Sequence, residues 1–173
     1  MTIEPQQLAE QGKKEFAAKK FEQAATTFME AATAYEKLDD LPNAAEMKNN
    51  LSVALLQAGK VQEAYEAAAG TDEAFAQAGD LKRQAMAFGN QAAALEALKK
   101  VDEALEAYER SAALFAEVGE GDMRSIVLQK AAALKLKRGK MVDSALSMIG
   151  SVESTPKPNL LQRFLKLLLR IKL

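Results

Sequence analysis

The chain has 173 residues, 49% of them hydrophobic and 27% charged, which is typical of one globular domain and argues against a disordered or fibrous protein. It contains no His and no Cys, so thiol and His-based nucleophiles, disulfides and the usual zinc, haem and iron–sulfur ligands are excluded. The net charge of −1 does not suggest a nucleic-acid-binding protein.

We therefore expect no cofactor and no metal. The N-terminal segment lacks the pattern of a secretory signal, and no apolar run reaches the roughly 18 residues that a membrane-spanning helix needs. We expect a soluble protein of the cytoplasm, because the absence of Cys fits a reducing compartment.

An internal repeat of 40 residues is the main signal in the sequence. The segment KFEQAATTF (20–28) recurs as KVQEAYEAA (60–68) and KVDEALEAY (100–108), and, after one inserted residue, as KMVDSALSM (140–148). These copies divide residues 1–150 into four repeats, at approximately 4–40, 41–80, 81–121 and 122–150.

Each repeat is predicted to form two helices joined by a short turn, because apolar residues recur at helical spacing on both sides of it. Gly59 and Gly139 stand where a left-handed residue would end the first helix of a pair. Between repeats, QAGD (77–80) and VGEGD (118–122) place Gly and Asp where one helix ends and the next is capped. Pro42 suits the first turn of the helix that opens the second repeat.

The pattern of small and aromatic residues predicts close packing of these helices. Small side chains recur where paired helices approach each other, at Ala24, Ala64 and Ala104. Aromatic side chains are expected to fill the wider gaps between pairs, at Phe28, Phe75, Tyr108 and Phe115. Since one pair cannot bury its apolar face alone, the pairs must stack. The predicted fold is an all-α solenoid of about four antiparallel helix pairs plus a C-terminal helix.

These features resemble those of tetratricopeptide repeat proteins. The resemblance covers roughly residues 4–150 and rests on the small residue of each first helix (Gly12, Ser52, Ala92), the Lys and apolar residue that open each second helix, and the three alanines named above. An aromatic residue follows at Phe28 and Tyr108 but is Ala68 in the second repeat. The 40-residue period is similar to the extended variant of adaptor proteins, since the standard unit has about 34 residues.

The resemblance implies a right-handed superhelix and a role as a scaffold or adaptor for another protein. In this family, ligands lie along a concave groove lined by the first helix of each pair. On this sequence that pattern selects the following candidate groove residues: Lys13, Asn49, Asn50, Val53, Leu56, Met86, Asn90, Ala93, Glu96 and Lys130.

Asn50 and Asn90 are the main candidates for contact with a peptide. They are 40 residues apart, and a carboxamide both donates and accepts hydrogen bonds, so it can hold the backbone of an extended peptide. They can equally be exposed helical residues or hydrogen-bond to the adjoining repeat. The matching position is Glu10 in the first repeat and Ala131 in the fourth. Lys13 replaces the Asn of the chaperone-binding subgroup, so we do not expect a chaperone adaptor.

The C-terminus departs from the repeat. Residues 151–159 are predicted to be a polar connector interrupted by two prolines, and 160–173 (LLQRFLKLLLRIKL) an amphipathic helix. Its candidate association face comprises Leu160, Leu161, Phe164, Leu165, Leu168 and Ile171. Five basic residues and no acidic one follow Pro156, whereas the first 156 residues carry a net charge of −6. This helix could cap the solenoid, join copies of the chain or lie on a membrane surface.

No catalytic constellation stands out. The Ser-x-x-Lys string at 154–157 lies in the proline-bearing connector, and the Gly–Lys pairs at 59–60 and 139–140 lack the rest of a phosphate-binding loop. We therefore expect a non-enzymatic protein that binds a peptide or helix of a partner in its groove. The alternative is a structural protein that assembles with itself, or docks on a membrane, through its C-terminal helix.

Overall fold

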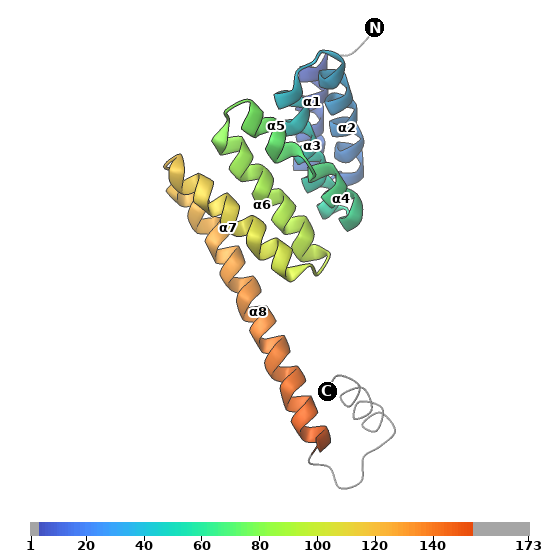
Figure 1. Ribbon diagram of the computed structural model, residues 1–173. Helices are drawn as coiled ribbons and strands as arrows, with labels where there is room; N and C mark the ends of the chain where they lie inside the picture. The colour runs from blue at the N-terminus through green and yellow to red at the C-terminus, as the bar shows by residue number, and fades with distance from the viewer. Residues whose placement is uncertain (1–3, 154–173) are drawn as a thin grey trace. The chain divides into compact units, whose positions relative to one another are not determined.

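A computed structural model of the chain describes the backbone of residues 4–153, and the side chains of residues 4–140 and of Val142 (Figure 1). All the regular structure in this part of the chain is α-helical, as the sequence predicts. Its elements are α1 (Pro5–Ala17), α2 (Phe21–Lys37), α3 (Leu41–Gln57), α4 (Val61–Ala68), α5 (Thr71–Gln77), α6 (Leu81–Ala97), α7 (Val101–Glu117) and α8 (Gly121–Glu153).

Six turns separate these helices at intervals of 20 residues, half the repeat. Each turn has a residue in the left-handed region, with φ between 59° and 78°, at positions 19, 39, 59, 79, 99 and 119. The next residue donates its backbone N–H to the carbonyl five residues back, as Lys100 does to Leu95 at 2.9 Å. The turns predicted at Gly59, Gly79 and Gly119 are confirmed. At the other three positions the left-handed residue is Lys19, Asp39 or Lys99, so glycine is not required.

The predicted helix caps are also present. Asp40 accepts a hydrogen bond from the backbone N–H of Asn43 at 3.2 Å, and Asp80 accepts one from that of Arg83 at 2.9 Å. Pro42 lies in the first turn of α3, where its missing N–H costs nothing. The sequence therefore sets both ends of these helices by local hydrogen bonding.

Unit 1 (Met1–Ala132) is built from stacked helix pairs. We call α1, α3 and α6 the first helices, and α2, α4, α5 and α7 the second helices. In the first and third repeats α1 packs on α2 and α6 packs on α7; in the second repeat α3 packs on both α4 and α5. Contacts of α2 with α3, and of α4 and α5 with α6, join successive repeats. Figure 1 lets the reader follow this order from blue to yellow.

Small residues allow the pairs to approach closely, as predicted. A Cβ on Gly12 would lie 2.7 Å from the ring of Phe28, so only glycine fits there. In the second repeat Ser52 donates a hydrogen bond to the carbonyl of Ala64 at 2.7 Å. Aromatic side chains fill the core between them, and all four predicted ones are buried: Phe28, Phe75, Tyr108 and Phe115.

The second helix of the second repeat is interrupted. It ends as α4 at Ala68 and resumes as α5 at Thr71, with Gly70 between them at a φ of 74°. In the first and third repeats the equivalent helices, α2 and α7, are continuous. The sequence carried a signal for this break, because Ala68 replaces the aromatic residue of the other two repeats.

The last described element differs from the expectation for a fourth helix pair. The turn predicted at Gly139 is wrong, because α8 runs through that position as one helix to Glu153. The first three residues of the predicted connector continue this helix; its remainder and the predicted helix at 160–173 lie outside the described residues. Val127, Ala131 and Leu134 are buried at helical spacing on α8. The boundary between unit 1 and unit 2 (Ala133–Leu173) falls within α8.

Candidate functional site

The predicted groove residues of the first two repeats meet at one cavity of about 200 Å³. Its lining combines three of them, Lys13, Asn50 and Val53, with three residues that the sequence analysis did not select for binding: Phe16, Phe28 and Glu46. The first helices α1 and α3 supply five of these six side chains, and α2 supplies Phe28. The cavity therefore has an apolar floor and a polar, partly charged rim.

The carboxamides of Asn50 and Asn90 are available for a ligand. Both side chains are half-buried on first helices, at equivalent places in successive repeats. Neither makes a hydrogen bond to any residue that the structure describes, whereas the buried polar side chains all have partners. Each can thus donate and accept hydrogen bonds without losing an internal one.

Lys13 gives the rim of the cavity a positive charge. Its ammonium group lies 2.9 Å from the Oε1 atom of Glu10, one turn earlier on α1, and both side chains are exposed. This hydrogen bond raises the pKa of Lys13 and lowers the pKa of Glu10, so both groups are charged at neutral pH. Because the pair is exposed, its contribution to stability is small, and Lys13 can exchange Glu10 for an acidic group of a partner.

Asn49 and Leu56 serve the fold. Asn49 is buried, and its Oδ1 atom accepts a hydrogen bond from Thr71 at 3.2 Å, which ties α3 to the start of α5. Leu56 packs against the core cluster that contains Leu51 and Leu55. These two residues were selected because they neighbour Asn50 and Val53, but on a helix adjacent residues point in different directions.

In the third repeat the candidates are spread along α6. Met86 is exposed, whereas Asn90 and Ala93 are half-buried. Glu96 has an internal partner, since its carboxylate accepts a hydrogen bond from the hydroxyl of Tyr108 at 3.0 Å. Burial, with the nearby charge of Glu96, raises the pKa of Tyr108, so this phenol stays protonated as a donor.

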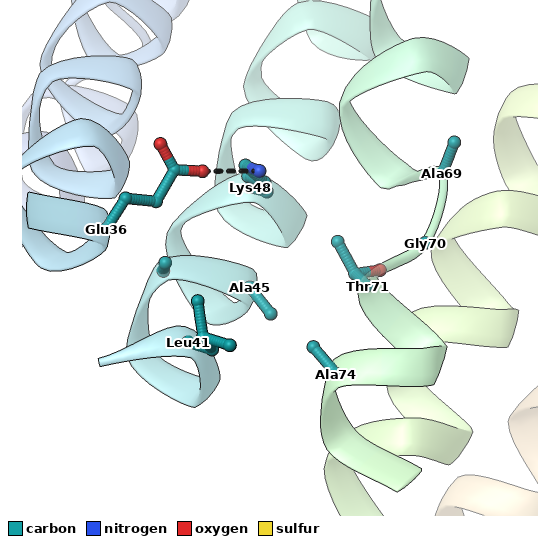
Figure 2. A pocket seen from close by; sticks show the side chains of 9 residues that line it. Glu36, Leu41, Ala45, Lys48, Ala69, Gly70, Thr71 and Ala74 are labelled. Carbon is teal, nitrogen blue, oxygen red and sulfur yellow. Dashed lines mark ion pairs between the residues drawn. The ribbon is translucent and has the colours of Figure 1, made fainter. Parts of the chain in front are cut away.

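The break between α4 and α5 forms a second hollow, of about 120 Å³ (Figure 2). Lys48 and Glu36 form an ion pair on one side of it at 2.6 Å, and Ala69, Gly70 and Thr71 line the other. Most of the lining is alanine or glycine, so the hollow exists because these side chains are small. The sequence analysis selected Lys48 only as a scattered basic residue; its partner Glu36 is on the preceding helix, at a distance that sequence spacing does not reveal.

The remaining candidates lie on α8 or beyond. Lys130 is exposed on α8, and its ammonium group has no partner among the described residues. The association face from Leu160 to Ile171 lies outside the described residues. Between residues 4 and 153 no helix is both long and apolar enough to cross a membrane. No cluster of acidic side chains suited to a metal ion occurs in that same stretch.

Stacked two-helix repeats, left-handed turns and small interhelical residues define a helical repeat protein of the tetratricopeptide type. A solved structure with this fold supports the assignment: the tetratricopeptide-like protein CT2138 of Chlorobium tepidum superimposes with a TM-score of 0.64 over 76% of this chain and 94% of its own, at 19% sequence identity. A search among curated protein sequences found no match.

The sequence pattern of the soluble NSF attachment protein (SNAP) family matches residues 7–164, which is most of the chain. The chain therefore belongs to the soluble NSF attachment protein family. Proteins of this family and of the tetratricopeptide type are helical repeat scaffolds for protein–protein interaction, without catalytic activity.

Proposed function

We propose that this chain is a non-enzymatic scaffold that holds a peptide or helix of a partner protein against its first helices, in the cavity beside Lys13, Asn50 and Val53. The observation that carries the proposal is the pair of carboxamides at Asn50 and Asn90, which have no hydrogen-bond partner among the described residues and recur 40 residues apart. The family name describes proteins that attach NSF, which supports a protein as the partner.

The charges of the two helix layers support the first helices as the binding face. The first helices carry five basic and four acidic residues, a net charge of +1, whereas the second helices carry two basic and twelve acidic residues, a net charge of −10. A nearly neutral face with an apolar floor suits recognition by hydrogen bonds and apolar contact. The acidic second helices instead keep the opposite face soluble and repel acidic proteins.

The mechanism is preorganisation. The stacked helices fix the positions of Asn50, Val53 and Phe28 before the partner arrives, so binding orders only the partner's segment. The phenyl rings of Phe16 and Phe28 would bury an apolar side chain of that segment, while the carboxamide of Asn50 pairs with its backbone. A cavity of about 200 Å³ accommodates one side chain of the segment and not a whole helix. We expect this to happen in the cytoplasm, since the chain has no Cys.

The test is capture of partners from native lysate by the wild-type chain and by the Asn50→Ala/Asn90→Ala variant. The proposal predicts a partner that is held by the wild type and largely lost by the variant, because each lost hydrogen bond lowers affinity by a factor on the order of ten. Thermal unfolding should be unchanged, since neither carboxamide has an internal partner.

The matched control removes two carboxamides elsewhere, in Gln23→Ala/Gln77→Ala. Both glutamines are exposed on second helices, so this variant should hold the partner as the wild type does. Equal capture by all three proteins would show that the partner binds away from the first helices, and the groove proposal would then be wrong.

A further inference from the structure

The continuity of α8 brings together a face that the sequence analysis did not predict. Ala133, Leu136, Lys137 and Lys140 have the spacing i, i+3, i+4, i+7, so on one uninterrupted helix they share a side. All four are exposed, and Leu136 is exposed to 61%. A turn at Gly139 would have separated Lys140 from the other three. We call these four residues the α8 face.

The charge of this region is strongly one-sided. Unit 2 carries nine basic and two acidic residues, a net charge of +7, while unit 1 carries 14 basic and 22 acidic residues, a net charge of −8. No Asp or Glu occurs between residues 123 and 142. Lys137 and Lys140 have no partner among the described residues, and only the neighbouring basic groups Lys135 and Arg138 make such an interaction.

The two lysines of the α8 face differ in this respect from those of the repeats. In unit 1, Lys13, Lys48, Lys60, Lys82 and Lys100 all pair with a carboxylate. Unpaired ammonium groups beside an exposed leucine form an amphipathic surface with a large apolar side chain and hydrated charges. This combination is typical of helices that lie at the interface of a membrane.

We propose that the α8 face binds the surface of an anionic lipid bilayer. Lysines hold a diffuse negative surface as point charges, whereas recognition of single carboxylates favours the fork of arginine. Leu136, and Val142 two residues beyond the face, would enter the headgroup region; Val142 is exposed to 50%. The sequence at 160–173, with four further basic residues and none acidic, adds a second signal of the same kind. The charge of −8 on unit 1 repels it from the same bilayer, so the groove remains open to a partner.

Sedimentation of the full chain with vesicles tests this proposal. Vesicles of phosphatidylcholine and phosphatidylserine should bind the chain, pure phosphatidylcholine vesicles should bind it far less, and added salt should weaken binding by screening. Lys137→Gln/Lys140→Gln should lower the binding constant roughly 30-fold, on the order of a factor of five for each lysine. The control Lys14→Gln/Lys37→Gln removes the same charge from exposed sites in unit 1 and should bind as the wild type does.

Three results would overturn the proposal. The first is equal binding to both kinds of vesicle. The second is unchanged binding of the Lys137→Gln/Lys140→Gln variant. The third is salt-dependent self-association of the chain without vesicles that the same variant abolishes, since this would assign the lysines to the acidic unit 1 of a second copy. Leu136→Ala separates the contributions, because it should weaken vesicle binding at low and high salt alike.

Discussion

The second helices of the second and third repeats solve the same packing problem in different ways. In α7, Tyr108 is buried and the helix continues through Arg110. Forty residues earlier, Ala68 and Gly70 occupy these positions and the helix breaks into α4 and α5. The difference teaches that the 40-residue repeat fixes where the helices lie, while single residues decide whether a helix is continuous.

Side chains on the first helices satisfy the backbone at the break. The carbonyl of Ala68 accepts hydrogen bonds from Thr71 at 2.7 Å and from Gln91 at 3.1 Å. Gln91 also donates to Asp72 at 2.6 Å, and Thr71 donates to Asn49. Since buried backbone groups must be paired, these polar residues make the break tolerable. In α7 the equivalent residue Ser111 instead donates to the carbonyl of Ala85, on the neighbouring first helix.

The largest effect is expected from removing the aromatic residue of α7. Tyr108→Ala should lower the free energy of unfolding by about 3–5 kcal/mol, because a large side chain leaves a cavity in a packed site. Tyr108→Phe removes only the hydrogen bond to Glu96 and should cost about 1 kcal/mol. Chemical denaturation measures both; similar losses for the two variants would show that the ring does not hold the third repeat together.

A smaller loss is expected at the break itself. Thr71→Val removes two buried hydrogen bonds and should cost about 1–3 kcal/mol in the free energy of unfolding. The control is Thr33→Val, on the continuous helix α2, where the exposed hydroxyl donates to the carbonyl of Met29. That change should stay within about 0.5 kcal/mol. If denaturant titrations give equal losses, the polar contacts at the break are not what stabilises it.

Exchanging the residue types at positions 70 and 110 tests the contrast between the two helices directly. Gly70→Ala should cost about 1–2 kcal/mol, because its φ of 74° is strained for any side chain even though the added Cβ would touch nothing. Arg110→Gly should cost about 1 kcal/mol, since glycine disfavours the interior of a helix. As a control, Gly121→Ala has a helical φ and open space, so thermal denaturation should show no loss.

The smallest effect concerns the turns. Lys99 adopts a φ of 63° at the position where Gly59 ends the first helix of the preceding repeat. Lys99→Gly should relieve that strain and raise the free energy of unfolding by about 1 kcal/mol. The reverse change, Gly59→Lys, should lower it by a similar amount. A thermal melt in which Lys99→Gly is less stable would mean that the side chain of Lys99 contributes more than the strain costs.

Local sequence signals predicted most of the fold. The repeat, the glycine turns, the Asp caps and the buried small and aromatic residues are all statements about neighbours in sequence or about equivalent positions. Gly139 was misread because a glycine can also lie inside a helix when nothing follows to cap it. The turns at Lys19, Asp39 and Lys99 carry no glycine, and only their 20-residue spacing marks them.

The candidate site was less predictable. The sequence selected Lys13, Asn50 and Val53, but the cavity also needs Phe16 and Glu46, which helix packing brings to them. It also selected Asn49, whose partner Thr71 lies 22 residues away, beyond the break. Which of two adjacent asparagines faces a groove depends on the rotation of α3, and this is set by contacts with other helices.

The central claim is that a partner binds on the first helices beside Asn50. A photo-crosslinking amino acid placed at position 50, or as a control at position 23 on α2, tests it most directly in lysate. The account predicts that one partner protein crosslinks to position 50 and not to position 23, with the crosslinked site in a contiguous peptide of that partner. Crosslinking from position 23 alone, or equally from both, would contradict it.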